Sequence, residues 1–275
     1  MNGNGTSDGG DRVYTTEAVL APAVACVSQT PAITNIISAG AFGARADFSP
    51  GSWLEVYGSN FSTVTREWGG ADFNGSTAPK SLDQVKVTIN GQEGFVSYIS
   101  PGQINVQAPE NAGAGPMAIT VTNCDKTSAP VTLQQLRSAP GLLAPPSAAF
   151  LVNGKQFLAA INPDGSYVGN IAGVASHPAI PGQTITTYGV GFGATTPGVV
   201  PGQITGGATD LANPLVMTVG GVQVTQIPYK GLVAPFVGLY QFNFVVPNVP
   251  DGDQPMTVQL GGVALPQTLF LSVKR

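Results

Sequence analysis

The sequence predicts an all-β protein built from two tandem β-sandwich domains, and three observations lead to this fold class. Only 9% of the 275 residues are charged, whereas 36 Gly and 23 Pro supply many turns. Abundant β-branched residues and few helix formers are typical of β-sheet proteins. Short apolar runs alternate with Gly/Pro turns, and one long phrase occurs twice. The length suffices for two domains that each have their own core.

The repeated phrase sets the domain organisation. SPGSWLEVYGSNF at residues 49–61 returns as IPGQTITTYGVGF at residues 180–192, an offset of 131 residues from Pro50 to Pro181. Further pairs follow in the same order: VKVTINGQ and VMTVGGVQ, QINVQAP and QFNFVVP, GPMAITV and QPMTVQL. A repeat of this length is about one small domain. We therefore expect a tail with a possible extra strand at residues 1–30, a first sandwich at 31–137 and a second at 138–275.

Strand alternation predicts which side chains form the two cores. In WLEVY, Leu54 and Val56 point to one face, whereas Trp53, Glu55 and Tyr57 point to the other. The same rule gives a first core of Leu54, Val56, Val85, Val87, Ile89, Ile104, Val106, Ile119 and Val121. It gives a second core of Ile185, Met217, Val219, Phe242, Phe244, Met256 and Val258. The Asn90-Gly91 pair and the Gly220-Gly221 pair each predict a tight hairpin turn.

The two cysteines, Cys26 and Cys124, leave two alternatives: one structural disulfide or two separate buried thiols. The disulfide is favoured because both residues border strand-like segments. There is no C-x-x-C pair and only one histidine, so the pattern does not indicate a metal or redox site. Chain entropy gives such a link on the order of 4–5 kcal/mol of stabilisation, as an upper figure.

The N-terminal segment belongs to neither repeat. Residues 12–21, RVYTTEAVLA, are rich in β-branched and apolar residues and could pair with an edge strand. Pairing within the same chain is favoured, and pairing with a neighbouring subunit would build a fibre by strand addition. The first residues lack the basic and apolar regions of a signal peptide, so we expect that any export signal has been removed.

Several phrases resemble known families. INPDGSYV (161–168), PAIPGQTITTYGVGFG (178–193) and IPYKGLVAPFVGLYQFNFVVPNVPDGDQP (227–255) resemble the Solibacter C-terminal-domain family, which occurs at the ends of large exported acidobacterial proteins. PGxxLxVYGxxF in the first repeat resembles IPT/TIG immunoglobulin-like domains. The resemblance covers about residues 31–275. It implies a pair of immunoglobulin-like sandwiches outside the cytoplasm, and it assigns no catalytic residue.

A search for reactive groups favours a non-enzyme without a cofactor. GTSDG at residues 5–9 matches a nucleophile elbow but lacks the strand and helix that the motif needs. The only histidine, His177, precedes Pro178 in a loop without a neighbouring carboxylate in sequence, so a Ser–His–acid triad is not indicated. Calcium binding at Asn162–Asp164 or Asp251–Asp253 stays open, although both also read as turns. We therefore predict no catalytic residues and no metal.

Charge and hydropathy limit the partners. A net charge of −4 without a basic run argues against nucleic acid, and no apolar run reaches the roughly 20 residues of a membrane span. The candidate binding residues are Trp53, Trp68 and Phe236, since aromatics on outer faces stack on sugars or anchor proteins. The alternative for Trp53 is that the N-terminal segment or the other domain covers it. Phe236 lies in the apolar loop 230–240, which marks an interface or folds back onto its own sandwich.

These observations predict a non-catalytic extracellular or cell-surface module with a structural or adhesive role, which includes self-assembly into a surface layer or filament. Its partner would be a protein or a second copy, bound through an edge strand or residues 12–21. The alternative function is a carbohydrate-binding module that uses the outward-facing aromatics. A third class, an enzyme of unrecognised type, would need His177 or a carboxylate pair buried in a pocket.

Overall fold

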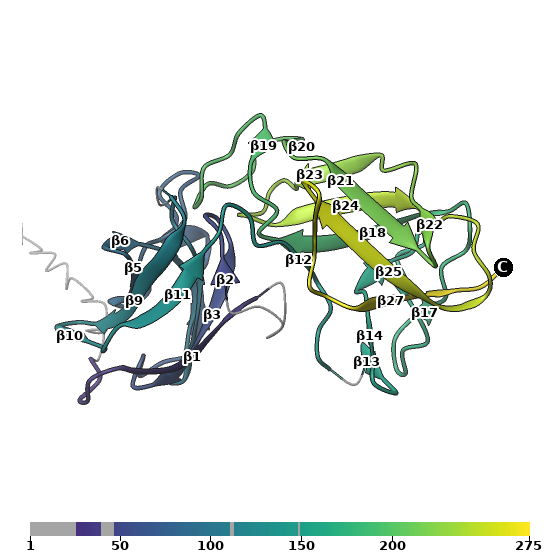
Figure 1. Cartoon of the computed structure of the whole chain (residues 1–275). Helices are drawn as coiled ribbons and strands as arrows, with labels where there is room; N and C mark the ends of the chain where they lie inside the picture. The colour runs from purple at the N-terminus through teal and green to yellow at the C-terminus, as the bar shows by residue number, and fades with distance from the viewer. Residues whose placement is uncertain (1–25, 40–46, 111–112, 148) are drawn as a thin grey trace, which may run out of the picture.

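The computed structural model describes residues 26–39, 47–110, 113–147 and 149–275 (Figure 1). In these ranges the chain folds into short strands and one 3-10 turn, η1(Gly70–Asp72), which confirms the all-β fold class. The strands form two sandwiches that follow one another along the chain (Figure 1). Over the same ranges there is no helix of the length and apolarity that a bilayer crossing requires.

The first sandwich consists of two facing sheets. One sheet has the order β1-β3-β8-β7-β4, and the other has the order β2-β11-β9-β5-β6 with β10 paired to β9. The strands of the first sheet are β1(Ala32–Ser38), β3(Trp53–Ser59), β8(Gln103–Gln107), β7(Phe95–Ile99) and β4(Arg66–Glu67). Those of the second are β2(Asp47–Phe48), β11(Val131–Gln135), β9(Gly115–Asn123), β5(Val85–Ile89), β6(Gln92–Glu93) and β10(Lys126–Thr127).

The second sandwich is larger because it carries extra short strands at one edge. One sheet has the order β17-β16-β15-β18-β24-β23, with β12 paired to β18. Its strands are β17(Ser176–His177), β16(Tyr167–Val168), β15(Ala160–Ile161), β18(Thr184–Val190), β24(Tyr240–Val245), β23(Tyr229–Leu232) and β12(Gly141–Leu142). The other sheet has the order β13-β14-β27-β25-β21-β22, with β26 paired to β25. Its strands are β13(Leu151–Val152), β14(Lys155–Phe157), β27(Leu269–Val273), β25(Gly252–Leu260), β21(Leu215–Val219), β22(Val222–Gln223) and β26(Val263–Ala264). A separate two-stranded sheet pairs β19(Thr195–Thr196) with β20(Asp210–Leu211).

The two sandwiches share the order of their central strands. The series β3-β8-β7 in the first corresponds to β18-β24-β23 in the second, and β11-β9-β5-β6 corresponds to β27-β25-β21-β22. In both, a short strand pairs in parallel with the last strand of the domain, β2 with β11 and β14 with β27. The repeated phrases of the sequence therefore occupy equivalent strands.

The predicted strand registers are confirmed by burial. In β3 the side chains of Leu54 and Val56 are fully buried, while those of Trp53, Glu55 and Tyr57 are only half-buried. Every residue that alternation assigned to the two cores has an exposed fraction of 5% or less. Fully burying a Val, Leu, Ile, Phe or Met side chain contributes about 1.5–3 kcal/mol, so the strands are held mainly by these two cores.

The repeated YGxxF phrase has a packing reason. A Cβ at Gly58 would overlap the carbonyl oxygen of Ala32 in the neighbouring strand β1. A Cβ at Gly189 would lie 2.7 Å from the carbonyl oxygen of Gly141 in β12. The ring of the following phenylalanine, fully buried at Phe61 and at Phe192, lies over each glycine. Glycine therefore lets an adjacent strand and a phenylalanine ring pack closely at the same point of each sandwich.

The two predicted hairpin turns are confirmed. Asn90 and Gly91, between β5 and β6, have φ values of 47° and 82°. Gly220 and Gly221, between β21 and β22, have φ values of 56° and 78°. Positive φ at both central residues is the requirement of the tightest hairpin turn, and Asn and Gly meet it with the least strain.

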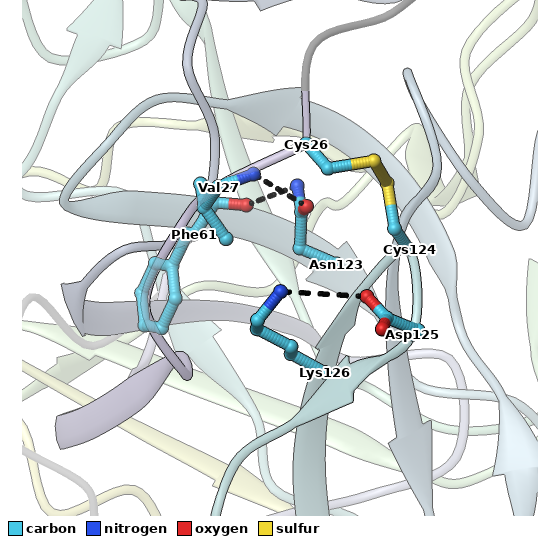
Figure 2. The surroundings of a disulfide bond; sticks show 7 residues. All are labelled: Cys26, Val27, Phe61, Asn123, Cys124, Asp125 and Lys126. Carbon is cyan, nitrogen blue, oxygen red and sulfur yellow. Dashed lines mark hydrogen bonds and ion pairs between the residues drawn. A yellow bond between two sulfur atoms is a disulfide. The ribbon is translucent and has the colours of Figure 1, made fainter.

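The predicted disulfide between Cys26 and Cys124 is confirmed, with the two Cα atoms 6.0 Å apart and a sequence separation of 98 (Figure 2). Beside it, the Asn123 side chain accepts a hydrogen bond from the Val27 N–H at 3.1 Å and donates one to the Phe61 carbonyl at 3.0 Å (Figure 2). The N-terminal part of the first domain is thus attached to the end of β9. Residues 12–21 lie outside the described residues, so their predicted strand pairing stays a prediction.

Candidate functional site

The two sandwiches meet at a packed junction. The loop after β19 in the second domain reaches the first domain, where Gln203 pairs with Thr77 in an isolated antiparallel bridge. The Ala78 N–H donates to the Gly202 carbonyl at 2.7 Å, and the Ile204 N–H donates to the Ser76 carbonyl at 2.9 Å. Backbone hydrogen bonds between domains define their relative position more strictly than side-chain contacts alone.

A buried glutamine links three segments at this junction. Gln107 ends strand β8 and is only 2% exposed. Its Oε1 accepts a hydrogen bond from the Gly202 N–H at 2.7 Å, and its Nε2 donates to the Gly51 carbonyl at 3.1 Å. Both ends of the amide are therefore occupied, one by each domain.

An aromatic cluster fills the rest of the junction. The rings of Trp53 and Trp68 pack edge to face with centroids 5.5 Å apart, and Trp68 packs on Phe73 at 5.0 Å. The Trp53 Nε1–H donates to the Val237 carbonyl of the second domain at 3.1 Å. The outer face of β3 carries Trp53 as predicted, and the second domain contacts this face at Trp53. Contact between Trp53 and the other domain was the alternative to a sugar-binding role for this residue.

The apolar loop 230–240 divides between the junction and solvent. Val237 is buried against Phe95 and Ala78 of the first domain. Phe236, the third candidate binding residue, is 52% exposed. The loop thus contacts the first domain through Val237 and exposes Phe236 to solvent.

Two glycines of the second domain fit closely against the first. A Cβ at Gly202 would overlap three ring atoms of Phe95, and a Cβ at Gly238 would overlap the Gln107 amide. Both have positive φ, 82° and 64°. Sequence analysis did not identify either position, because the contact partner is more than 90 residues away in the chain.

A cleft of about 440 Å³ opens beside this junction. Its charged groups are Glu110, which follows β8, and Arg137, which lies between the domains. The remainder of the lining comes from both domains: Pro50, Gly51, Gln107, Gly193, Ala194, Thr195, Gly198, Val199, Val200, Pro201, Leu232, Gly238 and Tyr240. Sequence analysis missed this cleft, since its lining residues come from distant segments of both domains, and the motif residues among them, such as Pro50 and Gly193, indicated only turns and strands.

The structure places a carboxylate beside the single histidine. His177 Nε2 lies 3.2 Å from Asp164 Oδ2, and His177 Nδ1 donates to the Pro178 carbonyl at 2.8 Å. The Pro178 carbonyl, and after it Asp164, raise the pKa of His177, because both accept hydrogen bonds from the protonated ring. Hydrogen bonds from Ser166 and the contact with His177 lower the pKa of Asp164 to about 2.

This group does not have the geometry of a catalytic triad. In a triad the nucleophile donates its proton to the histidine, and the acid orients the opposite ring nitrogen. Here the Ser166 hydroxyl donates to Asp164 Oδ1 at 2.7 Å. The side chains of His177 and Asp164 are 39% and 60% exposed, so solvent competes with their contact. The arrangement closes a surface turn between β15 and β17.

The calcium candidates have other partners. Asp253 pairs with Lys155 at 2.9 Å, and Asp251 accepts a hydrogen bond from the Arg275 N–H at 3.0 Å. Asp164 is occupied by Ser166 and His177. Among the described residues no three His, Cys, Asp or Glu side chains gather into a metal-binding group. Nothing in this geometry supports the calcium alternative.

Solved structures with a similar arrangement are distant from this chain. SGBP-B of a mixed-linkage glucan utilization locus from Bacteroides ovatus, in complex with a mixed-linkage heptasaccharide, has 13% identity and a TM-score of 0.39, covering 88% of this chain and 46% of that one. A surface glycan-binding protein from Prevotella bryantii has 14% identity and a TM-score of 0.28, covering 88% and 42%. This chain therefore spans less than half of their length, and likenesses at this level say nothing about ligands.

Curated protein sequences contain no match to this chain. A family model does match part of it. Residues 41–135, which include most strands of the first sandwich, match the IPT/TIG domain. The predicted resemblance of the first repeat is thereby confirmed, while that of the second half to the Solibacter C-terminal-domain family stays a prediction. The first sandwich contains an IPT/TIG immunoglobulin-like domain at residues 41–135.

Proposed function

We propose that this protein is a non-catalytic structural module in which two immunoglobulin-like sandwiches are held in one fixed arrangement. The observation that carries the proposal is the junction. Backbone hydrogen bonds, the Gln107 amide and the Trp53 indole all join one domain to the other. Domains linked by a flexible tether lack such contacts and move independently. A rigid pair is suited to spacing or orienting the parts of a larger assembly.

A location outside the cytoplasm is part of the proposal. The Cys26–Cys124 disulfide is the support, because such bonds persist in oxidising compartments and are rare in the cytosol. The low content of charged residues agrees with an exported sandwich protein. Cell fractionation with detection of the chain by antibody tests this point, and recovery only from the reduced cytosolic fraction would contradict it.

The absence of catalysis is likewise proposed on the geometry of the polar groups. The Ser166 hydroxyl donates its hydrogen bond to Asp164 and not to His177, so the histidine cannot take the proton of this serine. Solvent also reaches the His177 side chain. Turnover of a substrate by the purified protein, lost on substitution of His177 or another named residue, would refute this part.

Adhesion or self-assembly through an edge strand remains part of the proposal. Residues 12–21 would pair with their own domain in a monomer and with a neighbour in a fibre. Deleting residues 1–21 tests the second case. Assemblies of the full-length protein that electron microscopy finds unchanged after the deletion would exclude strand exchange by this segment.

Carbohydrate binding through Trp53, Trp68 and Phe236 has less support. The two indoles pack edge to face and are half-buried against a cluster that includes Val237 of the second domain, so less of their ring surface is left to stack on a sugar. Phe236 alone is well exposed. Affinity electrophoresis in polysaccharide gels, with Trp68→Ala and Phe236→Ala variants, separates this alternative from the structural role.

The test of the rigid pair uses the junction glycine. In Gly202→Ala the new methyl group collides with Phe95 and should push the domains apart. The matched control is Gly182→Ala, since Gly182 has a similar φ of 86° against 82° for Gly202, but open space around its Cβ position. Both substitutions carry the strain of a positive φ, and only the first disturbs the junction.

Small-angle X-ray scattering and tryptophan fluorescence give the readouts. Both tryptophans of the chain lie in the junction cluster, so their emission reports on it directly. We expect the wild type and Gly182→Ala to scatter as one compact arrangement with shielded tryptophans. Gly202→Ala should give a wider particle and stronger quenching by acrylamide. A wild type whose scattering requires many domain orientations would refute the proposed function.

A further inference from the structure

The cleft beside the junction has the size and place of a ligand site. Its volume of about 440 Å³ lies within the roughly 300–1,000 Å³ of small-molecule sites, which occur preferentially between domains. The lining comes from the first domain, the linker and the second domain. The site therefore exists only when both sandwiches are in place.

The walls of the cleft are held by interactions inside the protein. Gln107 uses both ends of its amide to bind Gly202 and Gly51. The Tyr240 hydroxyl donates to the Gly193 carbonyl, and burial raises the pKa of this phenol, so it remains protonated. A ligand would thus meet a preformed surface and would not have to order these groups, which lowers the entropic cost of binding.

Two charged side chains in the lining remain available. Within the part of the chain that the structure describes, neither Arg137 nor Glu110 has a side-chain hydrogen bond or ion pair, although both line the same cleft. A guanidinium group offers only donors, in a planar fork, and a carboxylate offers only acceptors. The rest of the lining supplies aliphatic groups, such as Val199, Pro201 and Leu232.

We propose that this cleft binds a neutral saccharide segment. The charges of Arg137 and Glu110 cancel, so a cationic or anionic ligand would gain from one and be repelled by the other. Every sugar hydroxyl both donates and accepts, so a saccharide can offer one hydroxyl to the carboxylate and another to the guanidinium without carrying a net charge. The C–H faces of a sugar ring would pack on Val199 and Pro201. This site is separate from the Trp53 and Trp68 cluster, and it rests on the proposed fixed arrangement of the two domains, because both of them line it.

The binding test uses four neutral hexasaccharides as probes: cellohexaose, xylohexaose, mannohexaose and laminarihexaose. Hexagalacturonate serves as an anionic probe and hexalysine as a cationic one. Saturation-transfer NMR detects contact with the wild-type protein, and isothermal titration gives the affinity. The variants are Arg137→Ala and Glu110→Gln. Matched controls are Lys274→Ala and Glu67→Gln, which change the same charges at positions that do not line the cleft.

We expect at least one neutral hexasaccharide to bind, and each cleft variant to weaken it about tenfold or more, because a hydrogen bond to a charged group is lost. The two controls should bind as the wild type does. Failure of all four neutral probes at millimolar concentration overturns the proposal. So does binding that is unchanged in Arg137→Ala, or binding of a charged probe alone. None of these outcomes affects the rigid arrangement measured by scattering.

Discussion

Replacing Gln107 by leucine should weaken the junction without disturbing either core. Leucine has a similar shape but cannot accept the Gly202 N–H or donate to the Gly51 carbonyl, which Gln107 does at 2.7 and 3.1 Å. Gly202 is buried, so its N–H would remain without a partner, at about 1–3 kcal/mol. The half-buried Gly51 carbonyl can reach water, so its lost bond costs about 0.5–1.5 kcal/mol. Together we expect about 1.5–4.5 kcal/mol of destabilisation.

Equilibrium unfolding in urea, followed by tryptophan emission, measures this change. Gln103→Leu is the matched control, because Gln103 lies on the same face of β8 and, among the described residues, its side chain binds only Asn105, at 2.8 Å. We expect the control to stay within about 0.5 kcal/mol of the wild type. If Gln107→Leu also stays within this range, the amide does not join the domains, and the reasoning about the junction is refuted.

Three further predictions concern the rest of the molecule. Reduction of the disulfide should lower the free energy of unfolding by up to about 4–5 kcal/mol, and equal urea midpoints with and without reductant would contradict this. Gly189→Ala should lower the free energy of unfolding by about 1–3 kcal/mol, because its methyl group would lie 2.6 Å from the Phe192 ring. The control Gly206→Ala should be tolerated, since nothing lies within 4 Å of its Cβ position. Equal thermal midpoints of the two variants would refute the packing argument. The pKa of His177, readable by NMR from the only histidine, should lie above 6.5 and fall towards 6.5 in Asp164→Asn. Because the pKa of His177 is raised in the folded state, the stabilisation by His177 is complete below pH 6.5 and is lost as the pH rises through the folded pKa. The pKa of Asp164 is lowered, so the stabilisation by Asp164 is present above pH 3.8 and is lost as the pH falls towards about 2.

Local periodicity explains why the sequence alone predicted the two cores. In a strand, successive side chains point to opposite faces, so Leu54 and Val56 must share a face whatever lies beyond them. A shift of one residue would have exposed every core side chain, and the burial pattern excludes such a shift. The hairpin turns followed in the same way, because Asn90-Gly91 and Gly220-Gly221 allow the positive φ that a two-residue turn requires.

The disulfide was only half determined by the sequence. Two cysteines allow a single intrachain pairing, and their positions beside strand-like segments favoured it, but the alternative of two separate thiols stayed open. The choice required the approach of residue 26 to the end of β9, where the Asn123 side chain holds the Val27 N–H. That contact spans almost a hundred residues, and no pattern of neighbouring residues encodes it.

The surroundings of the candidate binding residues were decided by the tertiary structure. The sequence placed Trp53 on the outer face of β3, but it could not say that the second domain contacts Trp53 there. The same limit applies to Asp164 beside His177, and to Arg137 and Glu110 in one cleft. Alternation within a strand is a property of the local backbone, so the sequence determined the inside of each sandwich. What lies against the outside depends on how the two sandwiches pack on each other, and contacts between distant segments, such as Gln107 with Gly202, decide that.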